Sequence, residues 1–210
     1  MEMLNEIGVV GLYTYMAACI AIYLAPGVDT MFIVSNGISG GVKAGFASAL
    51  GVAVGTTIHV IAAVVGLSLL VQENPFVFDI IKYVGAAYLA YLAAKTWINA
   101  SNATINGGRS VSVRQAFQRG IVSNLLNPKV IIFIFAFIPQ FIPAYASDKN
   151  LLFAYLGGIF ILGTIIFDGA AGIVSGMARE VIIKWFENSK VIDRFSACVL
   201  FLICVSVFLV

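Results

Sequence analysis

Long stretches without a charged side chain dominate this chain of 210 residues. They cover residues 7–28, 44–72, 130–147, 150–167 and 195–210. A helix needs roughly 20 mostly apolar residues to cross the hydrocarbon core of a bilayer, and these runs are of about that length. The chain is 61% hydrophobic and 10% charged, whereas soluble domains are about 45–50% apolar and about 25% charged. We therefore predict an all-α integral membrane protein that is surrounded by the lipid bilayer.

A further apolar run brings the number of predicted transmembrane helices to six, at about 7–35, 44–71, 76–97, 117–142, 150–176 and 193–210. Lysine and arginine favour the cytoplasmic side of a membrane. Nine such residues fall in alternate connections, and only Lys82 and Lys149 fall on the other side. We therefore expect both termini on the outer face. The nine are Lys43, Lys95, Arg109, Arg114, Arg119, Arg179, Lys184, Lys190 and Arg194.

Six helices divide into two halves of three, and an odd number of crossings turns the second half over. The predicted halves are residues 1–97 and 117–210, joined by a cytoplasmic linker at 98–116, and they form two inverted three-helix repeats. Each half opens with a helix that proline interrupts, at Pro26-Gly27 in helix 1 and at Asn127-Pro128 in helix 4. Proline removes a backbone donor and clashes with the preceding turn. Paired interruptions indicate the substrate site of a transporter, although a silent proline kink is the simpler alternative.

Each predicted break carries a charge, Asp29 after the first and Lys129 after the second. Such a residue costs about 2.5–3.5 kcal/mol at the centre of a membrane helix and normally faces a cavity or another charge. We expect both to bracket a polar site together with Asn124. Lys129 would attract a carboxylate there, and Asp29 would attract an ammonium group or carry a proton. In the alternatives, Lys129 reaches the cytoplasmic interface and Asp29 caps the helix after the break.

Two further residues are candidates for proton coupling besides Asp29. Asp168 lies between runs of 18 and ten uncharged residues. His59 lies near the middle of predicted helix 2, and its unperturbed pKa near 6.5 suits proton transfer. A buried structural histidine is the alternative, and a contact between His59 and Asp168 is conceivable because helices 2 and 5 correspond.

Several function classes are disfavoured. The single histidine and three scattered cysteines, Cys19, Cys198 and Cys204, predict no metal site. A net charge of +2 gives no basic surface for nucleic acid. No glycine-rich phosphate-binding motif occurs, so we expect no ATP-driven pumping and no cofactor within this chain. An intramembrane enzyme lacks a credible nucleophile or metal constellation, whereas a passive channel or membrane scaffold remains the alternative to a transporter.

Glycines recur at every fourth position in three stretches. Small residues at this spacing let helix backbones approach closely, so we predict tight helix packing there. Such faces also make a homodimer plausible. The glycines are Gly37, Gly41 and Gly45, then Gly51 and Gly55, then Gly172 and Gly176.

Several distinctive motifs occur in order along the chain, at residues 25–31 (APGVDTM), 41–55 (GVKAGFASALGVAVG), His59, 82–89 (KYVGAAYL), 117–129 (FQRGIVSNLLNPK) and 137–141 (FIPQF). Taken together, they resemble the LysE/RhtB family of amino-acid exporters. The resemblance implies a secondary active exporter of amino acids or their derivatives in the bacterial inner membrane. It also implies a proton gradient as the driving force and alternating access. The family commonly has Pro-Gly-Pro where this chain has Pro26-Gly27-Val28, so the choice of substrate does not carry over.

Overall fold

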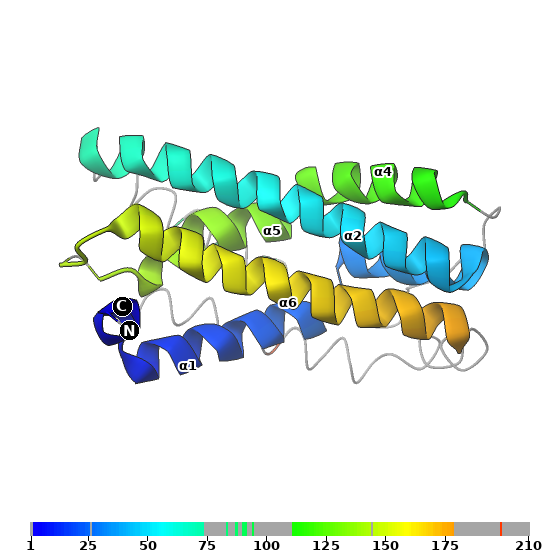
Figure 1. Ribbon diagram of the computed structural model, residues 1–210, viewed down its shortest axis with the longest axis horizontal. Helices are drawn as coiled ribbons and strands as arrows, with labels where there is room; N and C mark the ends of the chain where they lie inside the picture. Colours follow the sequence, from blue (N-terminus) through cyan, green and yellow to red (C-terminus); the bar gives the residue numbers. More distant parts are fainter. Residues whose placement is uncertain are drawn as a thin grey trace.

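The computed structural model describes residues 2–25, 27–73, 83, 87, 90–91, 94, 111–143, 145–178 and 198. This part of the chain is helical and contains no strand, which confirms the predicted all-α class. The elements are α1 (Glu2–Leu24), α2 (Val28–Glu73), α4 (Val113–Leu125), α5 (Pro128–Ile132), a π-helical turn η1 (Phe133–Phe137), a 3-10 turn η2 (Ile138–Phe141) and α6 (Lys149–Met177) (Figure 1).

Two described helices, Val28–Gly66 and Lys149–Met177, are long and apolar enough to cross a membrane. The pair Val113–Leu125 and Pro128–Phe141 passes the same test as one span bent by 52°, so the described residues contain two or three spans. The predicted helices at 76–97 and 193–210 and the linker at 98–116 lie wholly or largely outside the described residues.

Helix α2 folds back on itself at Gly41. The backbone there has a φ of 75°, in the left-handed region that glycine adopts without steric cost. Asn36 Nδ2 donates to Ser48 Oγ over 2.9 Å. Twelve residues of straight helix would place these two residues about 18 Å apart. Residues 28–40 and 42–73 are therefore two antiparallel legs of one hairpin.

This reversal moves the predicted helix boundaries. The first predicted helix was to end near residue 35, but its second part continues to residue 40, because the chain reverses only at the positive φ of Gly41. Helices α4 and α6 begin near their predicted starts. Ser112 Oγ caps α4 by accepting from the Gln115 N–H, and Asp148 caps α6 by accepting from the Leu151 N–H.

The predicted glycine packing is confirmed where α6 crosses both legs of α2. A Cβ atom added to Gly45 would overlap the Gly172 carbonyl, and one on Gly37 would overlap Ser175. A Cβ atom on Gly120 of α4 would likewise overlap the Ser48 carbonyl. Gly41 is the exception, because its position is open and its glycine serves the turn instead.

Both predicted interruptions are breaks between helices. α1 ends at Leu24 and α2 begins at Val28, while α4 ends at Leu125 and α5 begins at Pro128. Both breaks lie near the middle of the long axis of the bundle (Figure 1). α1 and the first leg of α2 run along this axis in one direction, and α4 and α5 run in the other.

An aromatic core fills the space between the breaks and the end of the bundle that holds the N-terminus. Phe133 packs against Phe137 and Phe160 with ring centroids 4.8 and 4.6 Å apart. The fully buried Tyr15 donates its hydroxyl to the Leu156 carbonyl over 2.8 Å. These contacts join α1, η1 and α6 on one side of the two breaks.

Candidate functional site

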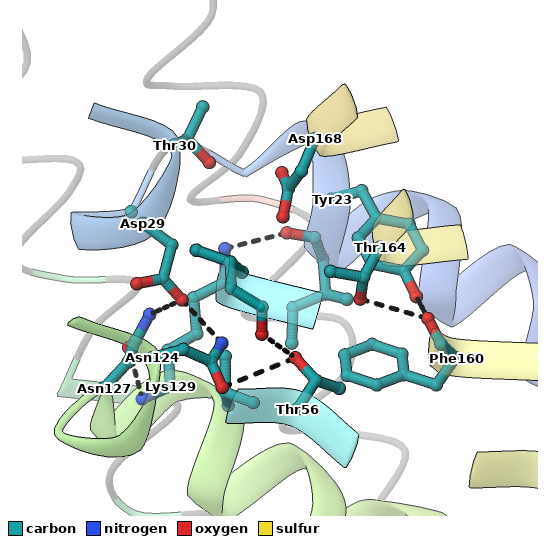
Figure 2. Close-up of a pocket in the computed structure, with 14 residues that line it drawn as sticks. Tyr23, Asp29, Thr30, Thr56, Asn124, Asn127, Lys129, Phe160, Thr164 and Asp168 are labelled. Atoms are coloured by element: carbon teal, nitrogen blue, oxygen red, sulfur yellow. Dashed lines mark hydrogen bonds between the residues drawn. The ribbon is translucent and has the colours of Figure 1, made fainter. Parts of the chain in front are cut away.

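The two breaks enclose a cavity of about 30 Å³. Residues of α1, α2, α4, α5 and α6 line it, so it joins elements from both halves of the sequence (Figure 2). The lining residues are Ile22, Tyr23, Gly27, Asp29, Thr30, Val52, Thr56, Asn124, Asn127, Lys129, Val130, Phe160, Thr164 and Asp168.

Asp29, in the first turn of α2, accepts hydrogen bonds from three side chains at or just before the second break, and Figure 2 shows two of them, Asn124 and Asn127. Its Oδ1 accepts from Ser123 Oγ at 2.7 Å, and its Oδ2 accepts from Asn124 Nδ2 and Asn127 Nδ2, both at 2.8 Å. Each bond is charge-assisted and therefore about twice as strong as a neutral one. The alternative in which Asp29 caps the backbone of its own helix is thus wrong, because its described hydrogen bonds come from α4 and the residues just after it.

Lys129 makes the reciprocal connection. Its Nζ donates to the carbonyl oxygens of Ile22 at 2.7 Å and Ala25 at 2.6 Å, at the C-terminal end of α1. These carbonyls have no partner within the helix, and the helix dipole makes this end negative. The alternative in which Lys129 extends to the interface is therefore wrong. Its backbone is held as well, because Asn127 Oδ1 accepts from the Lys129 N–H at 3.0 Å and caps α5.

The polar groups of each break are thus satisfied by the other break. The carboxylate after the first break binds donors next to the second, and the ammonium after the second binds carbonyls next to the first. Charged and freed backbone groups at membrane depth must find partners inside the protein. This crossed pairing supplies them without a direct contact between Asp29 and Lys129.

Asn124 is held from behind by α2. Its Oδ1 accepts from Thr56 Oγ1 at 3.4 Å, and its carbonyl oxygen accepts from His59 Nε2 at 3.3 Å. Gly55 leaves room for it, since a Cβ atom there would come within 2.8 Å of the Asn124 side chain. His59 therefore contacts Asn124 and is absent from the cavity lining, and its described contacts do not include Asp168.

Asp168 belongs to one face of α6, with Phe160 and Thr164 at the preceding helical turns. It is only 8% exposed, and its carboxylate points toward the cavity (Figure 2). Thr164 Oγ1 donates to the carbonyl of Phe160, as does the hydroxyl of Tyr23 from α1. Asp168 thus adds a second carboxylate to the cavity that holds the Lys129 ammonium.

Most of the site residues predicted from the sequence meet here. Gly27, Asp29, Asn124, Asn127, Lys129 and Asp168 line the cavity. Pro128 starts α5 but is exposed, and Pro26 lies outside the described residues. Sequence analysis missed Tyr23, Thr30, Thr56, Ser123 and Thr164. The i and i+4 spacing of Thr164 and Asp168 was an available signal, since it places both on one helix face.

The cavity combines charged groups of both signs with an apolar wall formed by Ile22, Val52, Val130 and Phe160. Within the described residues, His, Cys, Asp and Glu side chains do not gather in a group that could hold a metal ion. The arrangement is therefore suited to binding a small zwitterionic solute that carries an apolar group.

The chain is similar to one protein family and to several known proteins. Residues 20–210 match the family described as LysE type translocator. A leucine efflux protein of Enterobacter sp. (strain 638) is 34% identical over 177 residues, covering 80% of this chain and 83% of the relative. The leucine efflux protein of Salmonella typhimurium (strain LT2) is 36% identical over 166 residues, covering 77% and 74%. No solved structure matches the chain.

Proposed function

The chain belongs to the LysE type translocator family, and we propose that it exports amino acids with apolar side chains, leucine among them, from a bacterial cell. The family and the relatives named leucine efflux proteins are transporters, so the chain is a membrane transporter and not an enzyme. The substrate is taken from the names of these relatives, and the cavity supports it independently.

The chemistry of the cavity carries the proposal. Lys129 and Asp168 place one positive and one negative side chain on its wall, next to the apolar side chains of Ile22, Val52 and Val130. A leucine molecule presents a carboxylate, an ammonium group and an apolar side chain. Each of these three parts has a complementary group on the wall of one cavity.

The size of the cavity favours alternating access. A water needs roughly 10–15 Å³, so a cavity of about 30 Å³ holds about two waters. A leucine molecule requires the helices around the breaks to separate. We propose that Pro26, Gly27, Asn127 and Pro128 provide the backbone hinges for this movement, opening the site to one side of the membrane at a time.

The polar residues take distinct roles in this proposal. Lys129 attracts the substrate carboxylate, while Asp29 and Asn124 bind each other and keep the two breaks together around the site. Asp168, His59 and Asp29 are the candidates for coupling export to the proton gradient. Of these three side chains, only Asp168 points into the cavity and has no described hydrogen bond.

We propose that the architecture consists of six transmembrane helices in two inverted three-helix repeats, residues 1–97 and 117–210, joined at 98–116. The opposite directions of α1 and α4 in the bundle support it (Figure 1). The fold-back at Gly41 and the start of α4 lie at one end of the bundle, where Lys43 and Arg114 occur. In this proposal, that end faces the cytoplasm and both termini face outward. The protein lies in the inner membrane and forms a homodimer.

Counterflow in liposomes tests the proposal. Purified protein is reconstituted with an excess of unlabelled leucine inside, and radiolabelled leucine is added outside. A transporter gives a transient accumulation of label above equilibrium, which unlabelled valine or isoleucine suppresses and glutamate does not. The Asp148→Asn variant is the matched control, because Asp148 is an exposed helix cap outside the cavity.

Three results would contradict parts of the proposal. Leucine that equilibrates without overshoot would identify a passive channel. Counterflow of other amino acids but not of leucine would refute the substrate only. Absence of flux for every amino acid would refute the function.

A further inference from the structure

Asp168 is the one charged group of the cavity that makes no hydrogen bond within the part of the chain that the structure describes. Its side chain is only 8% exposed, lies among the lining residues and points into the cavity (Figure 2). In the part of the chain that the structure describes, no side chain or backbone group donates a hydrogen bond to its carboxylate. Asp29 accepts three hydrogen bonds, whereas Lys129 donates two and keeps its third N–H for a substrate carboxylate.

The titratable groups that face Asp168 come from three elements. They are Tyr23 of α1, Asp29 of α2 and Lys129 of α5, all on the wall of the same cavity. Tyr23 donates its hydroxyl to the Phe160 carbonyl and is thereby engaged. A buried carboxylate without a hydrogen-bonded cation or donor is costly. Two carboxylates and one ammonium group line the cavity, so one added positive charge, from a proton or from a substrate ammonium group, makes it neutral.

Resting on the proposed function, we propose that Asp168 binds the ammonium group of the exported amino acid and that the same carboxylate holds a proton when no substrate is bound. Substrate binding therefore replaces the proton on Asp168 by the substrate ammonium group. The O–H bond of the Asp168 carboxylic acid breaks, its proton passes to water on the side to which the site is open, and the freed carboxylate pairs with the substrate ammonium. No bond of the substrate changes.

This single shared carboxylate makes export an exchange. Substrate and proton exclude one another, so the carrier crosses the membrane outward with the amino acid and returns with a proton. Asp29 is excluded from the same role because displacing its three donors would leave Ser123, Asn124 and Asn127 without their acceptor. Asp29 and Asp168, both candidates for proton coupling by sequence, thus take different roles.

Binding measurements on the purified protein in detergent test the assignment with two ligands. One is leucine, and the other is 4-methylpentanoate, which keeps the carboxylate and the aliphatic chain but lacks the ammonium group. We expect Asp168→Asn to weaken leucine binding about 10- to 100-fold, as loss of a charge-assisted hydrogen bond predicts, and to leave 4-methylpentanoate binding unchanged. Asp168→Glu restores part of the leucine affinity, and Asp148→Asn changes neither.

Calorimetry in buffers of different ionisation enthalpy adds a readout that a structural role would not move. Below the pH at which the free site loses its proton, leucine binding to the wild-type protein releases one proton per molecule, and binding to Asp168→Asn releases none. Equal weakening of both ligands, or proton release that persists in Asp168→Asn, would overturn the inference while leaving the proposed function in place. A wild-type protein that neither binds nor transports any amino acid would overturn both.

Discussion

The bonds around Asp29 give a quantitative prediction for protein stability. Asn at this position keeps one oxygen to accept from Asn124 and Asn127, and its amide can donate to the Ser123 hydroxyl. The three bonds remain but lose their charge assistance. A hydrogen bond to a charged group contributes about 1.5–3 kcal/mol and a neutral one about 0.5–1.5 kcal/mol. Asp29→Asn should therefore lower the free energy of unfolding by about 3 kcal/mol.

Asp29→Ala removes the acceptor altogether. Asn124 and Asn127 are both buried, and each orphaned buried donor adds a penalty of about 1–3 kcal/mol. We expect a loss above about 5 kcal/mol, which is comparable to the whole stability of many domains. The graded order of wild type, Asn and Ala is the signature of a buried brace between the breaks.

Unfolding by SDS titration in mixed micelles, followed by circular dichroism, measures these differences. Asp148→Asn is the matched control, because Asn caps a helix as well as Asp does, and its change should stay within about 0.5 kcal/mol. Equal stability of Asp29→Asn and wild type would refute the charge assistance. Equal losses for Asn and Ala at position 29 would refute the bonding pattern itself.

Three further predictions follow from the fold and the exchange mechanism. Gly55→Ala should displace the Asn124 side chain, lower the free energy of unfolding by about 1–3 kcal/mol and reduce leucine counterflow. Gly66→Ala is the control, because the space around Gly66 is open, and it should be neutral or stabilising in the same SDS titration. Tyr15→Phe removes the hydroxyl bond to Leu156 and should cost about 0.5–1.5 kcal/mol of unfolding free energy without changing leucine affinity. Exchange of a neutral zwitterion for one proton moves one positive charge inward. In liposomes with a valinomycin-imposed, inside-negative potential of about 100 mV, worth about 2.3 kcal/mol, the outward leucine gradient should therefore rise about 50-fold. Transport that does not respond to the potential would contradict the exchange.

Within the described residues, the sequence alone located the long apolar helices and both breaks, because apolar run length and proline act locally. It also placed Asp29, Lys129 and Asp168 correctly as residues that lipid cannot surround. These inferences need no knowledge of which helix lies beside which. The same holds for the glycines of α6, whose spacing allows close contact whatever the partner helix is.

The pairing of the polar groups could not be predicted from local patterns. Asn127, which donates a hydrogen bond to Asp29, lies 98 residues further along the chain. Nothing near Asp29 in the sequence therefore indicated that its carboxylate has hydrogen-bond partners. Gly41 shows the same limit, because a glycine at every fourth position looks alike whether it packs against a helix or reverses the chain. Only the three-dimensional arrangement separated the braced carboxylate from the available one.

The crossed pairing of the breaks bears on how the protein is synthesised. Asp29 and the carbonyl end of α1 leave the ribosome long before Asn127 and Lys129, which complete them. At about 5–20 residues per second, a separation of 98 residues corresponds to about 5–20 s. During that interval the Asp29 carboxylate lacks its hydrogen-bond donors and is costly to place in hydrocarbon. Insertion of the helices around the first break is therefore complete only after the residues of the second break have been synthesised.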